Sequence, residues 1–535
     1  MGFVFSQPVS AAALPVALPA LTIRNLTISA LDLKLVERLD SDTHPHLHKP
    51  TAHAQIKAHT DASPTASTTE TSEDERPPLA RQQVTGVTIR PFTECQTRVY
   101  APNPHHHHEQ LRLTFQDIST GHLYSAEIPA PSRRSIVLKP HPKDFEEETK
   151  EFTAIYLAQH GYLALFSSAN LSTWMSTLDQ SLPLSALSIP GTHNSPTCHV
   201  ALPSVRCQAV SVQDQLANGV RFLDVRVSCP AYQPAPPASS SPPNNNPSPS
   251  PAPPPPIPPE LTLVHSAFPI SLTGPRRTLS GLLATLDTFL STHPSETILL
   301  SLKREGTGRG TDHDLSQILH AHYIPEQTYN KQWYTSPTIP TLSESRGRIV
   351  LVRRYHLHPS VPASQAGIDG SVWPDNVADG TCGSGTIRIQ DYYGVGSGAG
   401  IQRKLRFAQE GLQRAAAQGV VRHASEMPPG RELLPEEGRG EGRGELGPPP
   451  LFINFLSASN FFNASCWPAR IAVKMNPSMI EYLCMGHGAP SKGSDSSEIG
   501  NAATGIVVTD WVGHQGDWDL VRCIVGWNAR LQLRQ

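Results

Sequence analysis

The sequence predicts an α/β fold in which a (β/α) barrel follows a small all-β domain of the sandwich type. Short alternating or apolar runs, separated by polar breaks, continue from residue 21 to about residue 168. From residue 171 to about residue 530, apolar strand runs alternate with helical patterns. The length of 535 residues accommodates two domains with linkers, and residues 1–20 are expected to form an N-terminal tail.

The N-terminal region is expected to be antiparallel because its apolar runs are short and regularly interrupted. Residues 44–80 within it are rich in His, Thr, Ser and charged side chains, and we expect a disordered insertion there because so polar a segment buries too little surface to order itself. The expected strands are Leu21–Ile28, Leu31–Val36, Val84–Ile89, Leu111–Phe115, Ser135–Leu138 and Phe152–Leu157.

The C-terminal region shows its clearest βα unit between Thr278 and Lys303. Six apolar residues, from Leu279 to Leu290, recur at helical spacing, His293 to Ser295 interrupt the helix, and Thr297–Leu302 predicts a buried strand. With seven similar runs this makes the eight strands that a closed (β/α) barrel needs. The others are Leu187–Ile189, Arg221–Val227, Leu261–Val264, Arg348–Val352, Thr386–Ile389, Leu451–Phe455 and Ile506–Thr509. Two low-complexity stretches, 230–259 and 427–450, are expected to be insertions on the surface.

Composition excludes several classes of protein. The 43 basic and 46 acidic residues give a net charge of -3, which provides no general basic field, and no nucleic-acid partner is expected. The eight cysteines contain no C-x-x-C pair, so neither a disulfide scaffold nor a structural metal site is indicated. No apolar window is long enough for a transmembrane segment, and residues 1–21 lack the positive region of a signal peptide. We therefore expect a cytoplasmic protein with peripheral membrane association rather than a secreted one.

Titratable side chains recur where the predicted barrel strands end. Because the active sites of such barrels gather at the carboxyl ends of the strands, these side chains are expected to converge. Taken singly, each has a structural interpretation, such as an ion pair between Asp224 and Arg226 or a strand stopping at water at Lys303. Together, two imidazoles, a guanidinium and carboxylates suit general acid-base cleavage of a phosphodiester without a metal. The set is His193, Asp224, Arg226, His265, Lys303, Arg304, Glu305, Arg353, Arg354, Asp391, Tyr393 and Asp510.

Four stretches in this region carry a family resemblance. Ser188–Ser195, Gln215–Arg226, Leu263–His265 and Pro294–Lys303 resemble, in order and spacing, the X domain of phosphatidylinositol-specific phospholipases C, and the bacterial type most closely. The resemblance extends over about residues 171–530 and implies a somewhat irregular TIM-like barrel. It is most specific before Arg354.

The resemblance also implies roles for individual residues. His193 matches the general base that deprotonates the inositol 2-hydroxyl, and His265 matches the general acid for the diacylglycerol leaving group. Arg226 matches the arginine that stabilises the phosphate, with Asp224 beside it, and Asp510 matches the carboxylate that supports the first or the second histidine. The residues that match inositol-binding positions are Lys303, Arg354, Asp391 and Tyr393.

Asn194 departs from the bacterial pattern, which has aspartate after the first histidine. The calcium-dependent eukaryotic enzymes have asparagine there as a metal ligand, but their other calcium carboxylates would fall at Asp224, Arg226 and Lys303, and two cations at those positions would repel calcium. We therefore expect a site without calcium or other cofactors, with Asn194 among the substrate-binding residues and a weakened acid-base network.

The sequence thus predicts a phosphodiesterase that cleaves phosphatidylinositol, or a related inositol phospholipid, to diacylglycerol and inositol phosphate through a cyclic phosphate. Its expected partner is phospholipid at a membrane surface, bound transiently. Two alternatives remain open. One is a catalytically weak or inactive lipid-binding or scaffold protein on the same barrel, and the other is a phosphodiesterase for another glycerophosphodiester or a glycosylated inositol lipid.

Overall fold

The computed structural model describes residues 19–40, 80–84, 86–103, 109–130, 135–141, 150–233, 259–325, 332–383, 385–418, 448–489 and 500–533. The chain divides into two compact units, residues 1–25 with 29–165 and residues 26–28 with 166–535. Most of the tail 1–20 and of the expected insertions at 44–80, 230–259 and 427–450 lies outside the described residues. No described helix combines the length and the apolar character needed to cross a membrane.

The first unit is built from strands that form two sheets. Alternate residues of β7 are buried, which is the pattern of a strand with one face on a core. Ile23 of β1 and Phe115 of β6 belong to one hydrophobic cluster, so the two sheets share a core. One sheet has the order β5(Thr93–Tyr100), β1(Ala20–Leu26), β11(Tyr162–Ser167), β10(Phe152–Leu157), β8(Ser135–Val137); the other has the order β3(Ala80–Gln83), β2(Leu31–Asp40), β6(Glu109–Asp117), β7(Leu123–Ile128), β9(Lys139–Pro140), with β4(Thr88–Ile89) beside β2.

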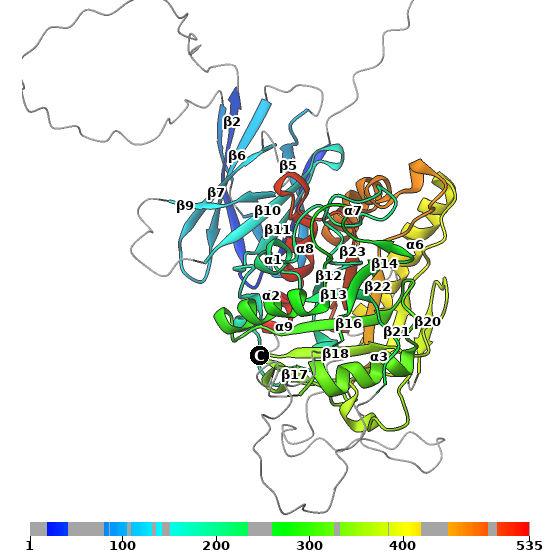
Figure 1. Ribbon diagram of the computed structural model, residues 1–535. Coiled ribbons are helices and arrows are strands. Elements are labelled where there is room, and N and C mark those ends of the chain that lie inside the picture. Colours follow the sequence, from blue (N-terminus) through cyan, green and yellow to red (C-terminus); the bar gives the residue numbers. More distant parts are fainter. Residues whose placement is uncertain are drawn as a thin grey trace, which may run out of the picture. The chain divides into compact units, whose positions relative to one another are not determined.

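The second unit is α/β, as predicted, and is organised around a twelve-stranded sheet (Figure 1). Seven neighbouring strands are parallel: β18(Ile349–Arg354), β16(Ile298–Arg304), β13(Phe222–Ser228), β12(Ile189–Thr192), β23(Ile506–Thr509), β22(Leu451–Phe455) and β21(Ile387–Gln390). β17(Trp333–Tyr334) continues the sheet beside β18, and β20(Gly380–Cys382) ends it beside β21. Among the described strands no ladder joins β17 to β20.

One of the eight predicted barrel strands was wrong. Leu261–Val264 corresponds to β14(Thr262–His265), which pairs antiparallel with β13 and with β15(Phe268–Pro269), while β13 pairs directly with β16. β14 therefore belongs to the connection from β13 to β16 and is not one of its parallel neighbours. The reason is that no helical pattern lies between β13 and β14, and an antiparallel return needs none. β17, which is parallel to β18, was not predicted.

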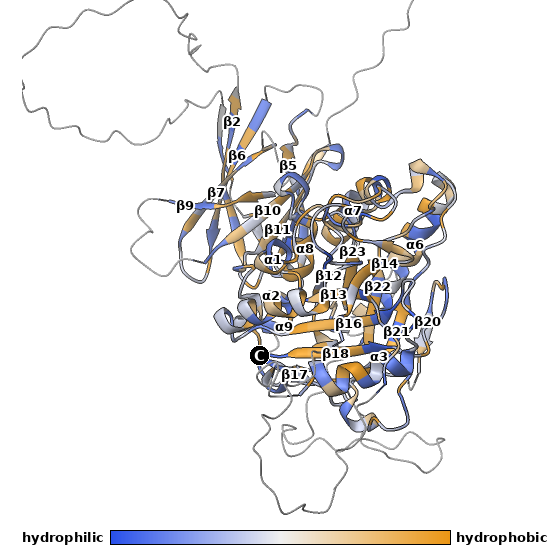
Figure 2. Ribbon diagram, in the orientation of Figure 1, coloured by the Kyte–Doolittle hydropathy of each residue, from blue (hydrophilic) through white to orange (hydrophobic). Residues whose placement is uncertain are grey.

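The two faces of the parallel strands pack into separate hydrophobic clusters. In β13, Phe222 contributes to one cluster, while Leu223 and Val225 contribute to the other, which packs against the predicted helix α2(Leu279–Thr292). Figure 2 shows β16 and β18 as mainly hydrophobic along their length. Side chains alternate along a strand, so Asp224 and Arg226 share the face of Phe222. The other helices are α1(Val212–Ala217), α3(Asp312–Ile318), α5(Leu342–Ser345), α6(Gly398–Ala416), α7(Pro468–Met485), α8(Asp519–Gly526) and α9(Ala529–Gln532).

Candidate active site

Three cationic side chains form a row across the carboxyl ends of β13, β16 and β18. The register pairs Arg226 with Lys303 and Lys303 with Arg354. One level below, Asp224 pairs with Ser301. Because paired residues of parallel strands point to the same face, the strand register alone brings these predicted residues together.

His193 follows β12 directly and is held from both sides of its ring. Its Nδ1 lies 2.9 Å from Asp510 Oδ1, a residue that follows β23. Its Nε2 lies 3.1 Å from Arg226 Nη2 and 3.1 Å from Asn194 Nδ2. Asp510 is therefore the support of the first histidine, the one at 193.

The charges around His193 and the hydrogen bonds at Nε2 favour different protonation states. Burial lowers the pKa of His193, but the Asp510 carboxylate and the Cys207 thiol raise it, and the net direction is upward. Arg226 and Asn194, however, both direct N–H donors at Nε2, and a protonated nitrogen there would face two further donors. We infer a neutral ring with its proton on Nδ1. The reason is that the Arg226 guanidinium can only donate hydrogen bonds, so Nε2 must be the acceptor.

The buried carboxylate of Asp224 is saturated by arginine. Its Oδ1 accepts from Arg354 Nη1 at 3.1 Å, and its Oδ2 lies 3.3 Å from both Arg226 Nη2 and the backbone nitrogen of Asn194. Burial would raise the pKa of Asp224, but the two guanidinium groups and His193 hold it well below the usual range. Asp224 therefore positions Arg226 and Arg354 as a permanent anion.

Glu305 ties the other side of Arg226 to Lys303. Its Oε1 accepts from Arg226 Nη1 at 2.9 Å and from Lys303 Nζ at 3.0 Å, and its Oε2 accepts from the Ser266 backbone N–H at 2.9 Å. Burial raises the pKa of Glu305, but Arg226 and Lys303 outweigh it and lower the pKa to about 2. Glu305 was predicted at a strand end but without a role. The signal for its role is that a row of cations on one face needs a counter-anion.

His265 ends β14 and lies opposite His193. The centroids of the two imidazole rings are 6.0 Å apart, with the rings nearly perpendicular. His265 Nδ1 lies 2.7 Å from the Val205 carbonyl oxygen, which only accepts, so this nitrogen carries the proton. The hydrogen bond to Val205 leaves Nε2 as the nitrogen that exchanges protons with a ligand.

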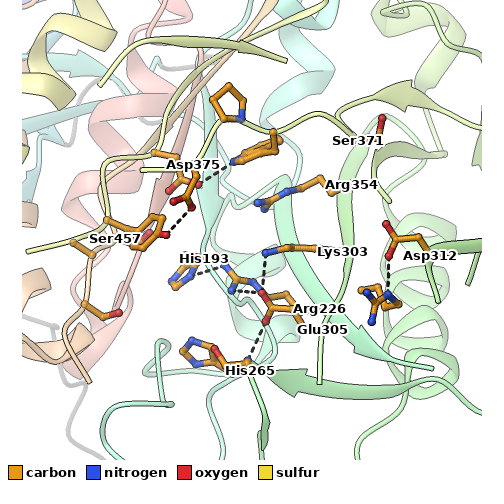
Figure 3. A pocket seen from close by; sticks show the side chains of 18 residues that line it. His193, Arg226, His265, Lys303, Glu305, Asp312, Arg354, Ser371, Asp375 and Ser457 are labelled. Carbon is orange, nitrogen blue, oxygen red and sulfur yellow. Dashed lines mark hydrogen bonds and ion pairs between the residues drawn. The ribbon is translucent and has the colours of Figure 1, made fainter. Parts of the chain in front are cut away.

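A polar cavity of about 510 Å³ opens at this end of the strands (Figure 3). Seven of the ten predicted site residues line it: His193, Arg226, His265, Lys303, Arg354, Asp391 and Tyr393. The other three, Asn194, Asp224 and Asp510, are almost fully buried and do not line it. The structure therefore places Asn194 behind His193, away from the cavity surface to which its predicted substrate-binding role assigned it.

Aromatic and acidic side chains line another part of the cavity. The Trp373 ring lies under the Arg354 guanidinium at 3.7 Å, and its Nε1 donates to Asp391 Oδ2 at 2.9 Å. The Tyr393 hydroxyl donates to Asp375 Oδ1 at 2.6 Å, and this bond raises the Tyr393 pKa to about 12. Trp373 and Asp375 were not predicted, because both lie between short strands without a periodic signal.

Cys207 lies behind the two imidazoles and was also missed. Its Sγ is 3.8 Å from His265 Nδ1 and 3.9 Å from Asn194 Nδ2, and the residue has no exposed surface. Burial and Asp510 raise the pKa of the thiol, but His265 and His193 outweigh them and lower it to about 7. Nothing in the spacing of the eight cysteines distinguished this one.

Comparison with known proteins locates the family resemblance. Residues 180–355 match the family described as phosphatidylinositol-specific phospholipase C, X domain, which confirms the resemblance predicted from the motifs. The chain is 28% identical over 203 residues to a 1-phosphatidylinositol phosphodiesterase of Listeria monocytogenes, covering 36% of this chain and 51% of that protein. It is 26% identical over 239 residues to the 1-phosphatidylinositol phosphodiesterase of Staphylococcus aureus strain Newman, covering 42% and 65%. The matches thus span between half and two thirds of these relatives.

Solved structures give weaker matches. A mutant of phosphatidylinositol-specific phospholipase C from Staphylococcus aureus aligns with 66% of this chain and 98% of its own at 20% identity, with a TM-score of 0.46. The phosphatidylinositol-specific phospholipase C from Listeria monocytogenes aligns with 67% and 99% at 21% identity, with a TM-score of 0.43. The predicted residues Asp391, Tyr393 and Asp510 lie beyond the family match at 180–355.

Proposed function

We propose that this protein is a metal-independent phosphodiesterase that cleaves phosphatidylinositol, or a related inositol phospholipid, to diacylglycerol and an inositol phosphate through a cyclic phosphate. The observation that carries the proposal is the pair His193 and His265, with ring centroids 6.0 Å apart, lining one cavity with Arg226 hydrogen-bonded to the first of them. The family match and the names of the relatives support the substrate class.

His193 acts as the general base at Nε2. With its Nδ1 proton held by Asp510, the lone pair of Nε2 accepts the proton of the attacking 2-hydroxyl, and Asp510 then stabilises the imidazolium. Asn194 can adapt to this change, because its Oδ1 has no partner within the described ranges and rotation of the amide would bring that acceptor to the new Nε2 proton. Asparagine at this position is thus compatible with turnover.

His265 acts as the general acid at the opposite side of the phosphate. When protonated, its Nε2 donates to the diacylglycerol oxygen as the P–O bond breaks, while the Val205 carbonyl keeps the ring oriented through Nδ1. Water then opens the cyclic phosphate with the two histidines in exchanged roles.

Arg226 stabilises the charge that develops on the phosphate oxygens. Its Nη groups are oriented by Asp224 and Glu305, and its buried Nε has no partner among the described residues. Lys303 and Arg354 extend the cationic row, and Asp391 and Tyr393 offer groups that accept and donate hydrogen bonds to inositol hydroxyls.

The donor set of the cavity does not fit calcium. Both oxygens of Asp224 already accept from guanidinium groups, and Glu305 is shared by Arg226 and Lys303. A hard cation requires free carboxylate oxygens, which these pairs do not supply. The phosphate is therefore neutralised by side-chain cations.

Contact with a membrane is supported by apolar side chains beside the cavity residues. Phe268 follows the cavity residue Ser266 by two positions and stacks on Phe461 with centroids 5.5 Å apart, and Phe461 follows the cavity residue Ser459 by two. Phe462 is 95% exposed. These rings suit insertion between lipid headgroups at the mouth of the cavity.

The membrane contact is testable with a single substitution. Phe462→Ser should reduce cosedimentation with phosphatidylinositol-containing vesicles while hydrolysis of a soluble inositol phosphodiester stays unchanged, because the exposed ring does not line the cavity. Val473, an apolar side chain that is 67% exposed on α7 and does not line the cavity, provides the control Val473→Ser. Equal vesicle binding by wild type and Phe462→Ser would refute this contact.

The strands and the cores of the two units also support a fold class for each. We propose a TIM-like barrel for the second, supported by its run of parallel strands whose inner faces share one cluster. A β-sandwich is proposed for the first, supported by two sheets that share a core.

The decisive experiment measures product from phosphatidylinositol vesicles with the purified full chain. Cyclic inositol phosphate should form in the presence of a chelator, and His193→Ala should lose about two to four orders of magnitude in rate. His293→Ala, which removes an imidazole at the end of α2, serves as the matched control. Loss of product in chelator would contradict the metal-independent mechanism. Absence of product with retained lipid binding would favour the non-catalytic alternative, and product from only a soluble glycerophosphodiester would favour the other phosphodiesterase.

A further inference from the structure

One side chain of the cavity wall and two side chains behind it form a cluster that the proposed reaction uses only in part. Ligand atoms of His193, Cys207 and Asp510 all lie within 4.8 Å of one another. Across the described ranges of the chain, no other three His, Cys, Asp or Glu side chains gather this closely. The proposed reaction uses the imidazole and the carboxylate and leaves the thiol without a role.

We infer that His193, Cys207 and Asp510 form an inhibitory binding site for a thiophilic divalent cation of the zinc type. Imidazole, thiolate and carboxylate are all established zinc ligands, and three protein ligands with a fourth position for water is a common arrangement. The class of cation follows from the sulfur, because calcium and magnesium prefer oxygen ligands alone. The inhibitory part of this inference rests on the proposed function.

Unpartnered polar atoms at the cluster support a missing ligand. Asp510 is 1% exposed, and its Oδ2 has no hydrogen-bond partner in the part of the chain that the structure describes. The same holds for Oδ1 of Asn194, whose amide nitrogen lies 3.9 Å from the Cys207 sulfur. Buried oxygens without partners are unfavourable, and a bound cation would satisfy the carboxylate oxygen directly.

Three separate chain segments hold the ligands firmly in place. The Cys207 N–H donates to Thr197 Oγ1 at 3.1 Å, and the Cys207 carbonyl accepts from the Trp511 N–H at 2.9 Å, which ties the thiol to the residue after Asp510. Gln208 Nε2 donates to the carbonyl oxygens of His193 and Thr509 at 2.7 and 2.9 Å. In tetrahedral zinc sites the ligand atoms lie about 3.3 to 3.6 Å apart. Side-chain rotations that move the ligand atoms by about 1 Å would therefore bring them to zinc-binding distance.

Charge balance at the cluster is also suitable. A thiolate and the Asp510 carboxylate neutralise a divalent cation, so the neighbouring Arg226 guanidinium, 3.1 Å from His193 Nε2, faces a neutral centre. His265 also faces the site, with its Nδ1 3.8 Å from the sulfur. The proton stays on Nδ1, which donates it to the Val205 carbonyl oxygen. Binding releases the thiol proton, and also the imidazole proton where Nδ1 is the ligand.

Occupation of the site would stop the reaction reversibly. A cation on His193 occupies the imidazole or displaces its Asp510 partner, and the ring then cannot accept the proton of the attacking hydroxyl. Both histidines line the cavity, so the thiol lies directly behind its wall and within reach of an ion that enters there. Free zinc would thus compete with turnover.

Direct binding of zinc to the full chain tests the site without reference to activity. Titration calorimetry with Zn²⁺ should give one equivalent on wild type, and Co²⁺ in its place should show a thiolate-to-metal charge-transfer band. Cys207→Ser should lose the band and bind Zn²⁺ about 100-fold more weakly or not at all. Cys229→Ser is the matched control, because the Cys229 sulfur contacts the Thr311 carbonyl and belongs to no cluster of three such ligands in the part of the chain that the structure describes.

Two results would overturn the site: no zinc binding by wild type, or equal affinity in wild type and a folded Cys207→Ser. Inhibition is measured on vesicles: at about 100 times the dissociation constant, Zn²⁺ should reduce wild-type turnover about 100-fold, with recovery in chelator. Cys207→Ser should resist. Zinc binding without any turnover in zinc-free protein would reject the proposed function and keep the site. Turnover unaffected by bound zinc would reject inhibition and keep the function.

Discussion

The arginines at the two ends of β13 differ in how many of their hydrogen-bond donors have partners. Arg221, just before the strand, has no exposed surface, and its Nε donates to Glu296 Oε2 at 2.9 Å. Arg226, near the other end, leaves its Nε without a partner among the described residues and keeps 14% of its side chain exposed. The remaining donors of Arg221 go to the carbonyl oxygens of Leu171, Ser172, Leu216 and Val220.

The two ends of one strand thus carry one arginine whose donors are all used within the protein and another that lines the cavity. At the amino end every donor of the guanidinium is used within the protein, so nothing remains for a ligand. At the carboxyl end, Arg226 and Arg354 line the polar cavity, and the Nε of each has no partner in the described part of the chain. Unpartnered buried donors are unfavourable in the free protein, and a phosphate that accepts from them would regain part of that free energy on binding.

The largest effect is expected from Arg221→Met. It leaves the Glu296 carboxylate buried without its cation and should lower the free energy of unfolding by about 3 to 5 kcal/mol. Denaturant unfolding of the full chain measures this loss. Turnover per folded molecule should change little, because Arg221 lies at the other end of the strand from the cavity.

A second variant checks that the loss comes from the orphaned carboxylate. Replacing both partners, Arg221→Met with Glu296→Leu, should recover a large part of the lost stability, since no uncompensated charge remains. A double variant as unstable as the single one would assign the loss to the carbonyl hydrogen bonds instead.

Arg226→Lys should show the opposite combination. A lysine cannot hold Asp224, Glu305 and a phosphate in fork geometry, so turnover on phosphatidylinositol should fall about 10²- to 10³-fold. Stability should change by less than in Arg221→Met, because a cation remains beside both carboxylates. Full turnover in this variant would contradict the assignment of Arg226 to the phosphate.

The side chains at the carboxyl ends of the strands were predictable where local rules place them. Period-two alternation puts Asp224 and Arg226 on one face, and the strand-end rule brings His193, Lys303 and Arg354 to the same edge. These inferences require only the strand and its direction, and seven of the eight predicted strands are parallel neighbours in the sheet.

Contacts that depend on long-range placement were not predictable. Cys207 meets His265 across 58 positions of the sequence, through a loop without periodicity. The pairing partner of β14 is β13, and the choice of that partner depends on tertiary placement. Asn194 could be identified by the motif, but its burial depends on the positions of Asp224 and His193 together.

The smallest expected effect concerns another buried cation, Lys404 of α6. Its Nζ donates to Gln390 Oε1 at 3.0 Å, and burial lowers its pKa to about 7, although Asp391 and Asp510 raise it. Between this value and the unfolded value near 10.5, the unfolded chain binds more protons, so stability should rise as pH increases through this window.

Lys404→Met should remove that slope and raise the melting temperature at neutral pH by about 2 to 4 °C. Gln390 Oε1 keeps the Tyr392 N–H as a donor, so the substitution leaves no orphaned acceptor. A lower melting temperature would mean that hydrogen bonds and charges within the protein fully offset the cost of burying Lys404, as they do for Arg221. A buried cation with all its donors used would then not be confined to the amino end of β13.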